Sequence, residues 1–216
     1  MTKHEPTDVV YLSRRDERAN AITHGVGFVA SLLAGVALWF HPASPSFGQS
    51  VAASVFVVAM AGVYFCSTMS HVVYEPRRRH RWRAWDQGVI YTMIAGTYTP
   101  FIYSFSPEGW RVTILLLVWL AAAFGFSSKV LVRYRVSGIS TVTYILLGWL
   151  PAIPLASRTP WECLAWMVAG GLAYTLGIIF LTRDKHVTYF HAMWHLMVMA
   201  GSAFHFVAVY RIPYLS

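Results

Sequence analysis

The sequence predicts an all-α protein, a bundle of seven transmembrane helices with a cytoplasmic N-terminus and a C-terminus outside. Three observations lead to this fold class. The 216 residues are 56% hydrophobic and only 12% charged, with a mean hydropathy of +0.50, whereas a soluble domain carries roughly 25% charged residues. The apolar residues form long segments with short, turn-rich connections such as HPASPSFGQS, SPEGW and SRTPWE. The strict two-residue alternation of a membrane β-barrel is absent.

Seven segments meet the requirement of about 20 mostly apolar residues for a membrane helix. They cover residues 21–40, 51–74, 87–105, 112–128, 139–157, 163–182 and 188–210. We therefore expect a cytoplasmic tail over 1–20, a single membrane domain over 21–210 and a short external tail over 211–216. The first twenty residues are polar and charged, which does not fit a secretory signal.

The basic residues predict the orientation of the bundle. Of the 17 Lys and Arg residues, 14 fall in the N-terminal tail and in the second, fourth and sixth connections, all on one side of the membrane. Only Arg111, Arg158 and Arg211 fall on the other side. Because basic residues concentrate in cytoplasmic loops, the N-terminus is expected inside. An odd number of crossings then leaves the C-terminus outside.

The same distribution excludes two function classes. The basic run RRRHRWR at 77–83 is expected to be a cytoplasmic loop, Arg77–Arg83, that sets the topology and meets anionic lipid headgroups, not a nucleic-acid site. A retinal pump needs a lysine in its last helix, and the three lysines, Lys3, Lys129 and Lys185, all lie outside the helix cores. Cys66 and Cys163 are in apolar contexts and are interpreted as inert core thiols.

Ionisable and polar residues from four segments fall at one expected depth, close to the cytoplasmic side. They are Glu17, Asn20 and His24 at the first segment, His71 at the second, Asp86 at the third, and His191 and His195 at the seventh. Ionisable residues in membrane helices are costly and usually functional. Their agreement in depth favours one shared site over scattered core residues.

The spacing of the histidines indicates a metal site. His191 and His195 are four residues apart and therefore share one helix face. With His71 from another helix they supply three nitrogen ligands, and three ligands with an open position are typical of catalytic zinc. Asp86 could ligate or, one step away, accept a proton from a water. Ser67, one turn before His71, could orient that water or hold a substrate oxygen. The alternative is that the histidines are buried for packing reasons.

The roles of the remaining candidate residues are less specific. Glu17, Asn20 and His24 could lie behind the metal ligands, form hydrogen bonds at the helix end or contact substrate. His205 is some ten residues beyond His195, roughly 15 Å along a helix, and is interpreted as structural. The other histidines are expected to be solvated in the tail and loops: His4, His41, His80 and His186.

Four stretches carry a resemblance to a known family: ERANAITHG, STMSH, WDQGVIYTMIAGTYTPF and HAMWHLMVMAGSAFHF. In these the chain resembles the bacterial hemolysin III family, within the progestin and adiponectin receptor (PAQR) superfamily. The resemblance implies seven helices, a cytoplasmic N-terminus and a zinc ion held by the residues matching His71, His191 and His195. It also implies that Asp86 and Ser67 lie beside the metal-bound water. It further implies a bacterial inner (plasma) membrane protein.

Two functions follow as hypotheses. The first is a zinc-dependent hydrolase, similar to the ceramidase-like amidases, that acts on a lipid amide or ester, with Asp86 moving the proton and Ser67 near the oxyanion. The second is a non-enzymatic protein, either cytolytic and pore-forming or a receptor-like regulator of membrane lipid homeostasis, in which zinc only joins helices. Membrane lipids are the expected partners in both.

Overall fold

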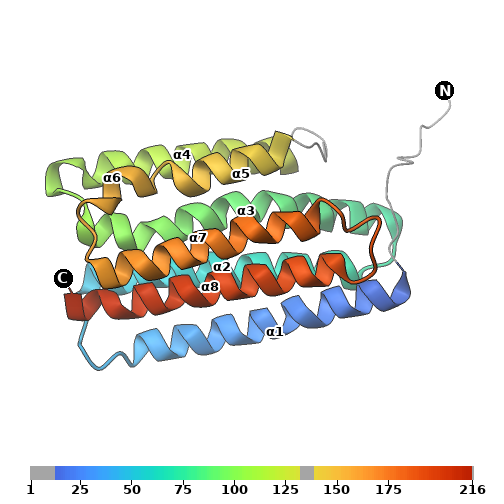
Figure 1. Cartoon of the computed structure of the whole chain (residues 1–216), viewed down its shortest axis with the longest axis horizontal. Helices are drawn as coiled ribbons and strands as arrows, with labels where there is room; N and C mark the ends of the chain where they lie inside the picture. The colour runs from blue at the N-terminus through green and yellow to red at the C-terminus, as the bar shows by residue number, and fades with distance from the viewer. Residues whose placement is uncertain (1–12, 132–138, 216) are drawn as a thin grey trace.

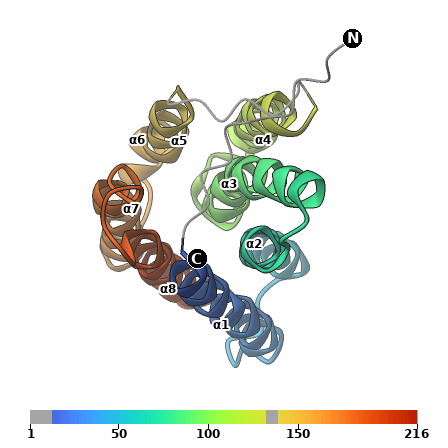
Figure 2. The same ribbon diagram turned by 90° about the vertical axis from the view of Figure 1, so that its right-hand side faces the viewer.

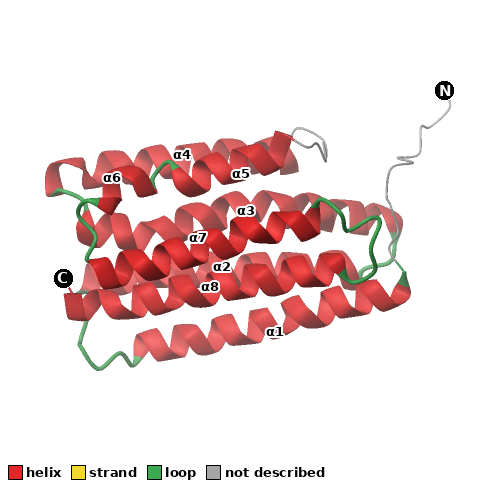
Figure 3. Cartoon of the chain, in the orientation of Figure 1, coloured by secondary structure: helices red, strands yellow, loops and turns green. Residues whose placement is uncertain are grey.

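The structure is a computed structural model that describes residues 13–131 and 139–215. All regular secondary structure in these two ranges is α-helical, as the composition predicts (Figure 3). The helices are α1 (Arg14–Trp39), α2 (Phe47–Val72), α3 (Pro76–Phe105), α4 (Glu108–Val130), α5 (Ile139–Trp149), α6 (Ala152–Ala156), α7 (Trp161–Leu181) and α8 (Phe190–Leu215). Residues 1–12, which include His4 and most of the expected tail, lie outside the described ranges.

The long helices lie side by side along one axis (Figure 1). Seen along that axis, α3 lies inside the bundle (Figure 2), where it packs against α2 and α4 and also contacts α5, α6 and α8. Helix α1 packs on α2 and α8, and α7 packs on α8. This order brings the first and last helices of the chain into contact.

Five helices are long and apolar enough to cross a membrane: α1, α2, α4, α7 and α8. Helix α3 does not reach that hydropathy, and its position explains why. Most of its second half is buried against other helices, so its side chains need not be apolar for contact with lipid. The seven crossings and the orientation of the termini remain predictions.

Several segment boundaries differ from those expected. Helix α1 begins at Arg14, not at residue 21, because Ser13 caps it by accepting a hydrogen bond from the backbone N–H of Asp16. Helix α8 continues to Leu215, so the expected external tail over 211–216 is helical up to that residue. The expected 139–157 helix is divided into α5 and α6 at Leu150–Pro151, where the proline cannot donate a helical hydrogen bond.

The largest correction concerns the arginine run. Helix α3 begins at Pro76, not at 87, with proline in the first turn and the Glu75 carboxylate accepting from the N–H groups of Arg77 and Arg78. The predicted Arg77–Arg83 loop is therefore helical. Arg79, expected to face lipid headgroups, is only 1% exposed.

Close packing of α7 on α8 depends on two glycines. A Cβ atom at Gly170 would come within 2.3 Å of the His205 ring, and one at Gly201 within 2.6 Å of the Tyr174 ring. His205 Nδ1 donates to the carbonyl of Gly201 at 2.8 Å, and its ring stacks on Tyr174. His205 thus has a packing role, consistent with its interpretation as structural. Cys66 and Cys163 are buried and free, also as expected.

The bundle has two ends of different character. At one end, called here the histidine end, α1, α3 and α8 begin and α2 finishes, and all the candidate site residues lie there. At the other end, called the pocket end, α2 begins and α1, α3 and α8 finish. In Figure 1 the histidine end is on the right and the pocket end on the left.

Candidate metal centre

Three histidine rings from two helices meet at the histidine end. His71 lies at the end of α2, and His191 and His195 lie in the first turns of α8. The centroid of the His71 ring is 5.1 Å from that of His191 and 5.2 Å from that of His195. The centroids of His191 and His195 are 4.6 Å apart. One ligand atom from each residue falls within 4.8 Å of the other two. This group could hold a metal ion.

The protein engages Nδ1 of each ring. His71 Nδ1 donates to Glu17 Oε2 at 2.7 Å, and His191 Nδ1 donates to Asp184 Oδ2 at 2.7 Å. His195 Nδ1 lies 3.2 Å from the carbonyl of Asn20. Carboxylates and carbonyls only accept, so the ring proton is on Nδ1 in each case. In the neutral ring this leaves a lone pair on Nε2, which is the form that binds metals.

Thr23 supports the same assignment for His195. Its hydroxyl lies 3.0 Å from His195 Nδ1 and already donates to backbone carbonyls of its own helix, those of Ala19 and Asn20. Toward His195 it therefore acts as an acceptor.

The state of His71 Nε2 is the observation that favours a metal ion at this site. This nitrogen is buried and has no hydrogen-bond partner within the described part of the chain. A buried polar atom without a partner costs about 1–3 kcal/mol. Metal-ligating histidines usually donate their second nitrogen to a carboxylate or carbonyl, which is the pattern seen for all three rings. The residues present fit a metal ion.

A buried ionic network lies behind His71. Glu17, 2% exposed, contacts His71 through Oε2 and forms an ion pair with Arg79 through Oε1. The Arg83 guanidinium lies 3.6 Å from the same oxygen. The network joins α1, α2 and α3. Isolated buried charges are destabilising, so Glu17 and Arg79 are expected to stay paired. The fixed Glu17 carboxylate then holds the His71 ring in one orientation.

Asp86 lies beside the histidines but outside the group of convergent ligand atoms. Its Oδ2 accepts from the Ser70 hydroxyl at 3.0 Å, and the Ser67 side chain also hydrogen-bonds to it. Its carboxylate interacts electrostatically with His71 and His191. Asp86 therefore faces the site, in the third turn of α3 and not at its opening.

Asn20 and His24 face the site from α1. The His24 ring stacks on His195, with centroids 3.5 Å apart. Both side-chain polar atoms of Asn20 are buried, and neither has a hydrogen-bond partner among the described residues. Of the three residues expected near the ligands, Glu17 touches a histidine through its carboxylate, Asn20 through its backbone carbonyl and His24 through its ring.

Sequence reasoning missed several residues of this region. Asp184 was not a candidate because it lies in a loop, although it precedes His191 by seven residues. Arg79 was hidden in the arginine run, and Thr23 has no distinguishing pattern. Asp16 was also missed: its Oδ1 accepts from the N–H of Tyr189 at 2.7 Å. That contact fixes the loop before α8, where Tyr189 has a φ of 65°.

The solvation predicted for the other histidines was wrong for His41. It is 6% exposed, with Nε2 donating to the carbonyl of Tyr210 at 2.8 Å and Nδ1 accepting from the N–H of Ala43 at 3.1 Å. His186 is exposed, as expected, and His80 is partly buried.

Comparisons with known proteins point to one family over most of the chain. Residues 12–206 match the family model described as Haemolysin-III related. Hemolysin-3 of Bacillus cereus is 36% identical over 207 residues, covering 92% of this chain and 93% of that protein. The Hemolysin-3 homolog of Bacillus subtilis (strain 168) is 34% identical, covering 94% and 98%.

More distant relatives also align over nearly the full length. The human monocyte to macrophage differentiation factor is 26% identical over 206 residues, covering 93% of this chain and 86% of that protein. No solved structure matches the chain.

Proposed function

The chain belongs to the Haemolysin-III-related family of multi-pass membrane proteins, and on that premise we propose that it is a zinc-dependent hydrolase of a lipid amide or ester. The observation that carries the proposal is the set of three histidines whose Nδ1 atoms are all engaged and whose Nε2 atoms remain for a metal. Imidazole ligands without thiolates suit zinc. We further propose a bacterial inner membrane as its location.

His71, His191 and His195 would hold the ion. When bound, zinc supplies Lewis-acid polarisation of the substrate carbonyl and makes an attacking water available near neutral pH. Three protein ligands leave a coordination position for substrate or water. The open position distinguishes a catalytic site from a closed structural one.

Asp86 would move the proton. Its carboxylate faces the histidines and is held by Ser70 and Ser67. It takes a proton from water as the water oxygen adds to the carbonyl carbon. It then returns the proton to the leaving nitrogen or oxygen as the C–N or C–O bond breaks. The products are a carboxylic acid and an amine or alcohol.

Asn20 and His24 would bind near the reacting groups. The side-chain polar atoms of Asn20 are buried and have no partner within the described ranges, so they can hydrogen-bond a substrate or its water, and the His24 ring lies next to them against His195. The site lies at the end of α2 and in the first two turns of α8, and this position suits a lipid bond just below the headgroup.

The test combines metal analysis with turnover. Purified wild type should contain one zinc per chain and hydrolyse at least one class of amide or ester lipid. His191→Ala should lose both zinc and turnover, whereas Asp86→Asn should keep zinc and lose turnover by about 10²–10⁴-fold, the usual contribution of a general base. His186→Ala, an exposed histidine from the preceding loop, is the matched control. Full zinc content without turnover on any lipid class would contradict the enzyme proposal.

A second function is favoured by the way the site joins helices. The three histidines and Glu17 join α1, α2, α3 and α8, and two relatives carry the name Hemolysin-3. In a non-enzymatic cytolytic or receptor-like protein, zinc would stabilise this junction only. Liposome leakage that requires His71 but is unchanged in Asp86→Asn would favour this function over hydrolysis.

A further inference from the structure

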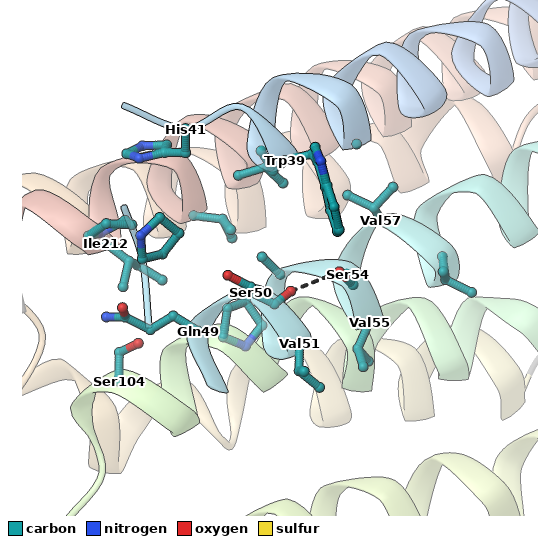
Figure 4. A pocket seen from close by; sticks show the side chains of 18 of the residues that line it. Trp39, His41, Gln49, Ser50, Val51, Ser54, Val55, Val57, Ser104 and Ile212 are labelled. Atoms are coloured by element: carbon teal, nitrogen blue, oxygen red, sulfur yellow. Dashed lines mark hydrogen bonds between the residues drawn. The ribbon is translucent and has the colours of Figure 1, made fainter. Parts of the chain in front are cut away.

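A pocket of about 1030 Å³ lies at the pocket end, away from the histidines. Its walls come from the second half of α1, the first half of α2, and parts of α3, α4 and α8 (Figure 4). Trp39 and Val58, which line it, are 80% and 71% exposed, so the pocket lies at the bundle surface. In a membrane-spanning bundle that surface faces lipid.

Along α2 the polar residues of the lining lie near the end of the bundle, interspersed with apolar residues such as Val51 and Val55. They include Gln49, Ser50 and Ser54, with Ser104 across from them on α3. Further into α2 the lining residues are all apolar and include Val57, Val58 and Gly62, with Gly35 and Leu38 contributed by α1. From residue 49 to 62 the helix rises by about 20 Å. Half of the hydrocarbon core of a bilayer is about 15 Å thick. The length of the pocket along α2 therefore matches that of one acyl chain with its head group.

The hydroxyl groups of the lining present hydrogen-bond acceptors. Ser50 and Ser54 each donate their hydroxyl proton to a carbonyl of their own helix, at 3.1 Å and 2.8 Å. Thr92, deeper in the pocket, does the same at 2.7 Å. Their oxygens can then only accept further hydrogen bonds. Ser104 Oγ is buried and has no partner in the described ranges.

The lining is also uncharged. None of its described residues is Asp, Glu, Lys or Arg. His41, the one ionisable side chain, uses both ring nitrogens within the protein, one donating to a carbonyl and the other accepting an N–H. An anionic headgroup buried here would have no cation to pair with, which is costly.

We propose that this pocket binds a neutral single-chain lipid whose head group carries hydroxyl donors, of the monoacylglycerol type. The chain lies along Val57, Val58 and Gly62, and the head-group hydroxyls donate to Ser50, Ser54 and Ser104. The site is separate from the metal centre and does not depend on the function proposed for it.

The experiment uses a photoreactive monoacylglycerol with a diazirine on the chain and the full-length protein in phosphatidylcholine nanodiscs. Detergent is avoided because alkyl maltosides are themselves hydroxyl-headed single-chain amphiphiles. The label should map to α1 and α2. Gly62→Phe should reduce labelling about tenfold, equivalent to about 1.4 kcal/mol. The variant should fold, because a Cβ at Gly62 meets no atom within 4 Å.

The matched control is Gly109→Phe, a helical glycine outside the pocket with equally open space around its Cβ; its labelling should match wild type. Ser54→Val, which removes one acceptor at an exposed position, should weaken labelling without a change in elution profile. Unlabelled monoacylglycerol should compete, and phosphatidylglycerol should not. Equal competition by phosphatidylglycerol, or unchanged labelling of a monodisperse Gly62→Phe protein, would overturn the proposal.

Discussion

The charged side chains behind the metal centre and the serines of the pocket form their hydrogen bonds in different ways. At the histidine end the charged groups bond across helices, as Glu17 does with His71 and Arg79. At the pocket end the hydroxyls of Ser50 and Ser54 bond back to their own helix. Cross-helix bonds fix side chains in one geometry, which an ion requires. Bonds within a helix leave space and acceptors, which suits a flexible ligand.

The difference also has an energetic side. Buried groups at the histidine end depend on each other, because each charge needs its partner. The serines at the pocket end depend on no other helix, so their loss should cost little. Substitutions at the two ends should therefore differ sharply in their effects on stability.

Removing Glu17 should have the largest effect. Glu17→Ala leaves the buried Arg79 without its counter-charge and should lower the free energy of unfolding by about 3–5 kcal/mol. Denaturant unfolding in detergent measures this. The control is Glu162→Ala, whose pair with Arg211 is 60% and 47% exposed and should contribute at most about 1 kcal/mol. Equal effects of the two variants would remove the contrast between the ends.

Metal binding should have the next largest effect. Zinc at a hundredfold excess over its dissociation constant should stabilise the protein by about 2.7 kcal/mol, because only the folded chain brings His71 to α8. Thermal unfolding with zinc and then with a chelator measures this shift. The shift should vanish in His195→Ala. A shift that persists there would mean that zinc binds elsewhere.

Loss of the Asp184 carboxylate should have a smaller effect, and this effect should be on zinc affinity. Asp184→Asn removes the anion that orients His191, and zinc affinity should fall about 10–100-fold. Competition with a chelating dye measures the affinity. Asp184 lies in a partly exposed loop, so the metal-free protein should keep its stability within about 0.5 kcal/mol. Unchanged zinc affinity would show that Asp184 does not support the ligand.

A serine at the pocket end should have the smallest effect. Ser54→Ala removes a hydroxyl that bonds only to its own helix and places a better helix former there. The free energy of unfolding should change by less than about 0.5 kcal/mol, and zinc content should stay the same. A loss above about 1 kcal/mol would indicate that Ser54 supports another helix.

The helical fold could be predicted because the length and composition of apolar segments are properties of the sequence alone. The start of α3 could not, because a run of arginines looks like a cytoplasmic loop until Glu75 and Pro76 are read as a helix start. Arg79 points inward, where Glu17 of α1 is one of its partners. That pairing depends on how the helices pack, which one sequence does not reveal.

The three histidines could be predicted for a similar reason. Their four-residue spacing places His191 and His195 on one face, and charge-based topology puts His71 at the same end. Asp184 and Thr23 act through loop and helix-packing geometry and have no spacing rule. The pocket is lined by scattered residues from five helices, so no sequence motif marks it.

The contact of α1 with α8 has a consequence for the order of assembly. Asn20 and His195 are 175 residues apart in the chain and yet adjacent in space. Chains fold from the N-terminus as they are made, so the Glu17 network can close once α3 has emerged. The pair His191 and His195 arrives only with the last helix. The metal centre is therefore the final part of the protein to be completed, and a nascent chain that stops before α8 would lack it entirely.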